Sequence, residues 1–120
     1  MGEIKSHKDL EVYKQSLDLV EEVYKLTKRL PGEEKFGLIS QMRRAAVSII
    51  SNIAEGAARK NTKEYIQFLY MSLGSLSELE TQIEVSIRLK FIESNTELIN
   101  KLHHINSMLT GLIASLKRKL

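Results

Sequence analysis

A row of hydrogen-bonding side chains recurs at three- and four-residue spacing in the middle of the 120-residue sequence. This spacing places the side chains on one face of an α-helix. Amides, hydroxyls and guanidinium groups suit hydrogen-bonded contact better than simple solvation, for which lysine and glutamate are usual. Two interpretations stay open: a structural network within a helical bundle or between subunits, or a surface for a ligand or nucleic acid. The row comprises Gln41, Arg44, Ser48, Asn52, Glu55 and Arg59.

Motifs for catalysis are missing from the sequence. We find no glycine-rich phosphate loop, no H-E-x-x-H motif and no nucleophile elbow. Glu55 and Glu78 are the one conceivable acid–base pair, but arginines in the same row favour structural pairing. The adjacent His103 and His104 would point about 100° apart on a helix, so they cannot share a metal ion as residues i and i+4 do. We therefore predict a non-enzymatic protein with no catalytic residue, metal, cofactor or small-molecule substrate.

The basic residues of the sequence support a binding function better than its carboxylates and histidines support catalysis. The net charge is +3 and the pI is near 9.2, which permits a nucleic acid as partner without requiring one. Phosphate binding needs cations, with asparagine and glutamine as auxiliary donors. The candidates near the centre of the chain are Arg43, Arg44, Arg59, Lys60 and Lys63, and a second group ends the sequence at Lys117, Arg118 and Lys119.

Three observations weaken this hypothesis. Glu78, Glu80 and Glu84 make the following segment acidic. No aromatic residue is interleaved with the basic ones to stack on bases. Arg43 and Arg44 point in different directions on a helix, so they need not form one patch. A solvated charged surface therefore remains the alternative.

Four amphipathic segments must position these residues, over about 8–30, 33–58, 62–90 and 95–119. The first ends at Pro31-Gly32, and Gly37 either kinks the second or separates a short turn from it. Asn61 with Glu64, and Ser94 with Glu97, match the capping box and predict the starts of the last two helices. Because the connections are short, sequential helices should be antiparallel neighbours. The prediction is an all-α, up-down-up-down four-helix bundle with a single domain over residues 1–120.

Two further features suggest contacts beyond one bundle. Apolar residues cover about half of the first helix, more than one seam needs: Leu10, Tyr13, Leu17, Val20 and Tyr24 form one edge, and Val12, Leu19, Val23, Leu26 and Leu30 form the other. Gly74, flanked by serines, costs about 1 kcal/mol within a helix, which suggests that another backbone approaches there. We expect a structural or oligomer network of Gln41, Ser48, Asn52, Glu55, Gly74, Ser75 and Glu78.

The sequence predicts a cytoplasmic protein. It has no cysteine, and no apolar run approaches the roughly 18 residues of a membrane span. Its N-terminus lacks the apolar region of a signal peptide.

The segments QMRRAAVSIISNIAEGAARK and EYIQFLYMSLGSLSELETQIEVS, with DLEVYKQSLDLVEEVYKLT before them, resemble the 23S rRNA intervening-sequence proteins of bacteria. This resemblance implies a four-helix bundle that forms homo-oligomeric rings, with pentamers as the expected form. It also implies similarity to the basic accessory protein of diversity-generating retroelements, which is implicated in binding nucleic acid and a reverse transcriptase. It implies no catalytic residues.

Two functional hypotheses follow. The first is an oligomeric bundle that binds RNA or another nucleic acid without reading its sequence, through the five central basic residues. The second is a protein-interaction scaffold, working through the apolar face of the first helix or the small-residue surface at Gly74.

Overall fold

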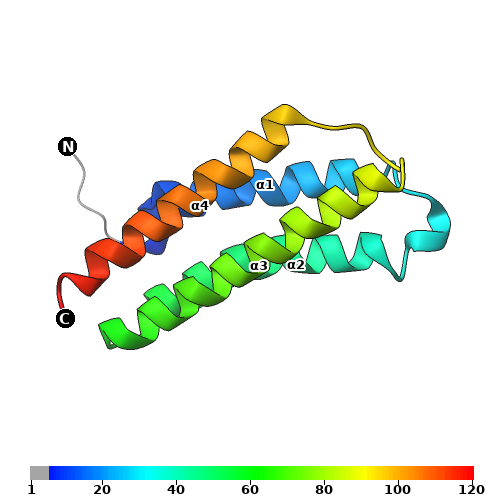
Figure 1. The fold of residues 1–120 in the computed structure, drawn as a ribbon. Helices are drawn as coiled ribbons and strands as arrows, with labels where there is room; N and C mark the ends of the chain where they lie inside the picture. Colours follow the sequence, from blue (N-terminus) through cyan, green and yellow to red (C-terminus); the bar gives the residue numbers. More distant parts are fainter. Residues whose placement is uncertain (1–5) are drawn as a thin grey trace.

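The chain folds into four α-helices, each antiparallel to the one before it, as Figure 1 shows. The computed structural model describes residues 6–120, apart from the side chain of Asp9. Within this range there is no β-strand, so the predicted all-α four-helix architecture is confirmed. In chain order, the elements are η1 (His7–Asp9), α1 (Glu11–Thr27), η2 (Gly32–Glu34), α2 (Leu38–Ala57), α3 (Thr62–Arg88) and α4 (Thr96–Lys117).

Polar caps set the starts of the last two helices. The side chain of Asn61 accepts a 2.8 Å hydrogen bond from the backbone N–H of Glu64, which confirms the predicted start of α3. At α4 the cap is Asn95, whose side chain accepts from the N–H of Leu98 at 3.1 Å. The prediction of Ser94 as the cap is therefore wrong by one residue. Gly37 separates η2 from α2, so the main helix begins at Leu38 rather than near Glu33.

The end of α3 has no sequence signal of the usual kind. Lys90 adopts a left-handed backbone conformation with φ 65°, a position where glycine is typical. Its N–H donates to the carbonyl of Ile87 and the N–H of Phe91 donates to that of Ser86, both at 2.9 Å. This pair of bonds is a Schellman motif, which satisfies carbonyls that the helix end would otherwise leave free.

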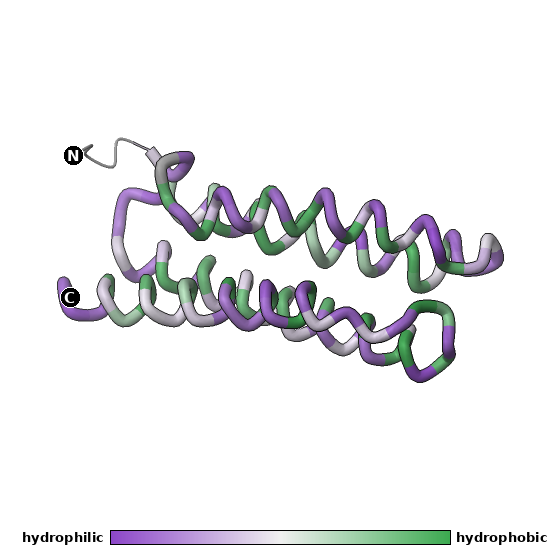
Figure 2. Tube along the Cα trace, turned by 90° about the horizontal axis from the view of Figure 1, so that it is seen from above, coloured by the Kyte–Doolittle hydropathy of each residue, from purple (hydrophilic) through white to green (hydrophobic). Residues whose placement is uncertain are grey.

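The core runs the length of the bundle, and hydrophobic residues lie on the facing sides of the helices (Figure 2). The edge of α1 that begins at Val12 is buried as one set, whereas Leu17 and Tyr24 on the other edge are exposed. In α4 the apolar residues that recur every three or four positions, Leu98, Leu102, Ile105, Leu109 and Leu116, are buried. Leu112, which continues this period, is only half-buried, and Ile113 is buried as well. Among the fully buried side chains are Leu19, Met42, Ile49, Ile53, Leu69, Leu79, Leu102, Ile105 and Leu109.

The close approach between helices occurs at a different glycine from the one expected. Gly56 on α2 is buried, and a Cβ atom there would lie 2.8 Å from the Cβ of Phe68 and 3.2 Å from the backbone oxygen of Tyr65. Gly74 is exposed, and a Cβ atom there would meet no atom within 4 Å. Within the described chain no backbone packs against Gly74, and the approach of another chain to this position stays a prediction. Gly56 permits the tight contact of α2 with α3.

Candidate nucleic-acid interface

The centre of the polar row on α2 connects α2 to α3. Ser48 and Ser75 lie on the two helices with their hydroxyl oxygens 2.8 Å apart. The side-chain amide of Asn52 donates to the carbonyl and hydroxyl of Ser48, at 2.9 and 3.1 Å. Beneath them, the buried hydroxyl of Ser72 donates to the carbonyl of Ile49 at 2.8 Å. These bonds favour the structural interpretation for this part of the row.

The ends of the row are exposed. Glu55 lies 3.8 Å from Arg59, one helical turn away, so the predicted pairing of this carboxylate with an arginine is confirmed. Arg44 and Glu78 border the same surface hollow, of about 450 Å³, together with Gln41, Ala45 and Ser48. Within residues 6–120 neither Arg44 nor Glu78 has an ion-pair partner. That another subunit contacts this hollow stays a prediction.

Arg43 is directed toward α1. Its Nε donates a 2.8 Å hydrogen bond to the hydroxyl of Thr27, and its Nη2 donates to the carbonyl of Tyr24 at 3.4 Å. Its guanidinium also lies 4.5 Å from the centroid of the Tyr24 ring. The helical rise of 1.5 Å per residue separates Arg43 from Arg59 by about 24 Å along α2. The structure therefore does not bring Arg43, or its neighbour Arg44, together with the other basic candidates.

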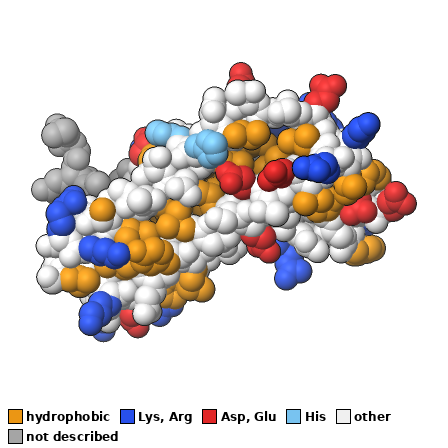
Figure 3. All heavy atoms as spheres, viewed as in Figure 1, with side chains coloured by type: hydrophobic (Ala, Val, Ile, Leu, Met, Phe, Trp, Pro, Cys, Tyr) orange, Lys and Arg blue, Asp and Glu red, His pale blue; other side chains and the backbone are white. Residues whose placement is uncertain are grey.

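The remaining basic candidates gather at one end of the bundle with the last residues of the chain. Figure 1 places the α2–α3 turn and the C-terminus at the same end. A surface hollow of about 560 Å³ there is lined by Lys60, Lys63, Gln67 and Leu120, among others. Lysine and arginine side chains are prominent at this end, on the left in Figure 3. We call this region the basic end and define it as Arg59, Lys60, Lys63, Lys117, Arg118 and Lys119.

Aromatic rings accompany two of these cations. The guanidinium of Arg59 lies 4.6 Å from the centroid of Phe68, and the ammonium of Lys117 lies 5.3 Å from that of Tyr70. Lys117 Nζ also donates a 2.8 Å hydrogen bond to the Tyr70 hydroxyl. The expectation that no aromatic residue is interleaved with the basic ones is therefore wrong. Local spacing could not reveal the second pair, because its members are 47 residues apart.

Glu80 and Glu84 of α3 lie away from the basic end, whereas Glu64, in the first turn of the same helix, lines the hollow there. Glu80 and Glu84 border a hollow of about 280 Å³ between α3 and α4, whose apolar lining includes Ile87 and Ile99. His103 Nε2 lies 3.3 Å from a carboxylate oxygen of Glu80. His103 and His104 are both exposed, because they lie outside the buried row of Leu98, Leu102, Ile105 and Leu109 on α4. The acidic segment therefore does not cover the basic end.

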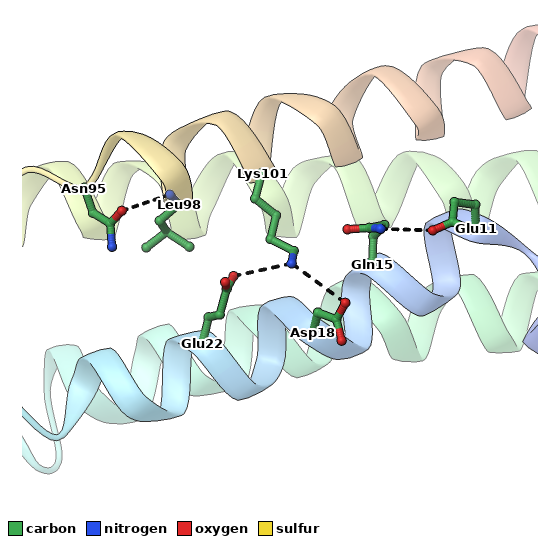
Figure 4. A network of polar contacts seen from close by, with 7 residues as sticks. All are labelled: Glu11, Gln15, Asp18, Glu22, Asn95, Leu98 and Lys101. Atoms are coloured by element: carbon green, nitrogen blue, oxygen red, sulfur yellow. Dashed lines mark hydrogen bonds and ion pairs between the residues drawn. The ribbon is translucent and has the colours of Figure 1, made fainter.

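Another charged contact is structural. Lys101 of α4 reaches between two carboxylates of α1, at 3.8 Å from Asp18 and 3.7 Å from Glu22 (Figure 4). All three side chains point into the space between α1 and α4, so the contact joins these helices. Exposed ion pairs contribute at most about 1 kcal/mol each.

Two features of the described part of the chain bear on function. Residues 6–120 contain no group of three or more histidine and acidic side chains arranged to hold a metal ion. None of the helices described combines the length and apolar content that crossing a membrane requires.

Comparison with known proteins agrees with the helix motifs. Residues 8–111 match the family model described as 23S rRNA-intervening sequence protein. A crystal structure from Bacteroides thetaiotaomicron, of a protein with unknown function from the S23 ribosomal protein family, has 29% sequence identity and a TM-score of 0.75. The superposition covers 85% of this chain and 97% of that one. No curated protein sequence matches the chain. The chain belongs to the family of 23S rRNA-intervening sequence proteins.

Proposed function

We propose that this protein is a non-enzymatic helical bundle that binds RNA, or another nucleic acid, through its basic end. The observation that carries this proposal is that the end of the chain lies against the start of α3. Leu120, which follows the basic residues 117–119, lines one hollow with Lys60 and Lys63, and Lys117 contacts Tyr70 of α3. Cations gathered in this way can neutralise several phosphates at once, and phosphate contacts do not depend on base sequence. A cytoplasmic location, where RNA is present, is part of the proposal.

The contributions of individual cations should differ. Lys60 and Lys63 are exposed and have no ion-pair partner among residues 6–120, so they are free to contact phosphate. Arg59 already lies near Glu55 and over Phe68. Arg43 is engaged with Thr27, and Arg44 lies outside the basic end. We therefore revise the set expected from the sequence: Lys60 and Lys63 should contribute most, and Arg43 and Arg44 little.

The test is a titration with a structured RNA at increasing salt, starting at 50 mM. The family name connects these proteins to intervening sequences of 23S rRNA, so a folded RNA segment is the first ligand to try. Replacing Lys60 and Lys63 together by alanine should weaken binding and reduce the slope of log K against log salt by about 1.4–1.8, since each phosphate contact contributes about 0.7–0.9.

The matched control is the double variant Lys25→Ala/Lys28→Ala. These two lysines are exposed near the end of α1, at the opposite end of the bundle. Their loss removes the same charge from the molecule but should leave the salt slope nearly unchanged. No binding by the unmodified protein at 50 mM salt, or equal losses in both double variants, would contradict the proposal.

We also propose that copies of the chain associate, with a pentamer as the expected form. The support is an uncovered apolar edge: Leu17 on α1 is 47% exposed, Tyr24 lies exposed two turns further along, and Val47 is exposed on the adjacent α2. Association would multiply a modest basic surface through avidity. Native mass spectrometry should detect five chains for the unmodified protein and one for Leu17→Lys. The control Leu89→Lys, which alters an exposed leucine just after α3, should keep five.

The same apolar edge also supports the second functional hypothesis, a protein-interaction scaffold. A scaffold for another protein would use these residues without RNA. An unmodified protein that binds no RNA and whose mass is that of one chain would favour this scaffold.

A further inference from the structure

We infer that Tyr70, hydrogen-bonded by Lys117, is a stacking site for an unpaired nucleobase, so that the basic end prefers single-stranded RNA to a fully paired duplex. The inference rests on the proposed function and specifies its ligand. Three observations carry it: the exposure of Tyr70, the open space at Gly74 one turn later on α3, and the cations around the tyrosine.

The ring of Tyr70 is presented at the surface. Tyr70 is 48% exposed although it lies on α3, which packs against both α2 and α4. Its hydroxyl accepts the hydrogen bond from Lys117, which limits the orientations of the ring. A ring held in this way loses little conformational freedom when a second ring stacks on it.

Gly74 leaves the surface of α3 bare one turn after Tyr70. Helical side chains lean toward the N-terminus, so a side chain at position 74 would lie over residue 70, one turn earlier. Glycine places nothing there, and the surrounding space is open to 4 Å. α4 also carries a small side chain near this region, because the exposed residue one turn before Lys117 is Ala114. The space that the sequence suggested at Gly74 is thus available to a ligand.

The surrounding charge identifies the class of ligand. Lys63 lies two turns before Tyr70 on the same face of α3, and Lys117 of α4 contacts the ring directly. In Figure 3, cations border an apolar surface at this end of the molecule. A single strand offers both matching groups, a base for the ring and phosphates for the lysines. A duplex offers the phosphates, but its bases are already stacked on one another.

The test compares a short unstructured RNA strand with a fully paired RNA duplex of the same length. Tyr70→Ala should weaken binding of the strand at least about fivefold, which is the lower limit of a base–aromatic stack at about 1 kcal/mol. Binding of the duplex should change less than about twofold. Tyr70→Phe keeps the ring and should retain strand binding within about twofold, because stacking needs no hydroxyl.

Two matched controls separate this site from general effects of the substitutions. Phe36 is 89% exposed, has Lys35 Nζ 5.6 Å from its ring centroid and lies at the other end of the bundle, so Phe36→Ala should leave strand binding unchanged. Gly74→Gln should weaken strand binding as Tyr70→Ala does, because its long side chain would lean back over residue 70. Gly111→Gln, at another exposed helical glycine with open surroundings, should have no effect.

The outcomes distinguish this inference from the proposed function. If Tyr70→Ala leaves strand binding intact, or weakens strand and duplex equally, the stacking site is overturned. The basic end would still stand if Lys60→Ala/Lys63→Ala weakens binding of both RNAs. If the unmodified protein binds neither RNA at 50 mM salt, the proposed function fails and the stacking site fails with it.

Discussion

Arg43 donates a 2.8 Å hydrogen bond from its Nε to the hydroxyl of Thr27, and this bond joins α2 to α1. Thr27 is fully buried and its hydroxyl donates in turn to the carbonyl of Val23, also at 2.8 Å. An arginine whose surface role was plausible from the sequence therefore stabilises the fold. Its neighbour Arg44 is exposed, so two adjacent residues of one type have different roles.

Arg43→Ala should lower the free energy of unfolding by about 1–2 kcal/mol, since a bond to a charged donor and the packing of the guanidinium on Tyr24 are both lost. Urea denaturation measures this change. Arg44→Ala is the matched control and should stay within about 0.5 kcal/mol of the unmodified protein. RNA affinity should change less than about twofold in both. A variant of Arg43 with unchanged stability and weaker RNA binding would contradict this division of roles.

The substitution of glycine by alanine should have opposite effects at two positions. Gly56→Ala should destabilise the protein by about 1–3 kcal/mol, because the new methyl group would lie 2.8 Å from Phe68 Cβ and 3.2 Å from the Tyr65 backbone. Gly74→Ala should stabilise it by about 0.5–1 kcal/mol, because helix propensity rises where the space is open. Thermal unfolding of the two variants, followed by circular dichroism, checks both signs. Loss of stability in Gly74→Ala would reveal a contact at that position that a single chain lacks.

Lys90→Gly should raise the free energy of unfolding by about 1 kcal/mol. Lys90 has φ 65°, a left-handed backbone conformation that is unfavourable for a residue with a Cβ atom and favourable for glycine, which has none. Lys90→Ala removes the same charge but keeps the Cβ atom, so it should give no such gain. Denaturant midpoints of the three proteins decide the matter, and an equal gain in both variants would attribute the effect to charge instead.

Tyr65→Phe should protect the protein from alkaline destabilisation. Burial raises the pKa of the Tyr65 phenol above its usual value of 10.0. The folded state therefore holds the phenolic proton more tightly than the unfolded state does, so this contribution to stability is complete below pH 10 and is lost as the pH rises through the folded-state pKa. Thermal unfolding at neutral pH and above pH 10 should show a steeper decline for the unmodified protein than for Tyr65→Phe. Parallel declines would contradict the expected shift.

The sequence by itself determined the four helices, their order and most of their buried faces. These features depend on residues within a few positions of each other. The period of Leu98, Leu102 and Ile105 marks the inner face of α4, and Asn61 with Glu64 marks the start of α3. Local sequence also explains the one-residue error at the start of α4. Serine and asparagine are both good N-caps, so the neighbouring Ser94 and Asn95 were equally suitable, and the structure uses Asn95.

Only the tertiary structure decided which side chains meet across helices. Lys117 reaches Tyr70, Arg43 reaches Thr27, and Gly56 rather than Gly74 admits a neighbouring helix. Each of these contacts depends on the register and separation of two helices, which follow from packing of the whole core rather than from the period of either helix. The basic end arises in the same way: its lysines and arginines come from two distant segments, and they form one surface because an antiparallel bundle returns the end of α4 to the turn between α2 and α3.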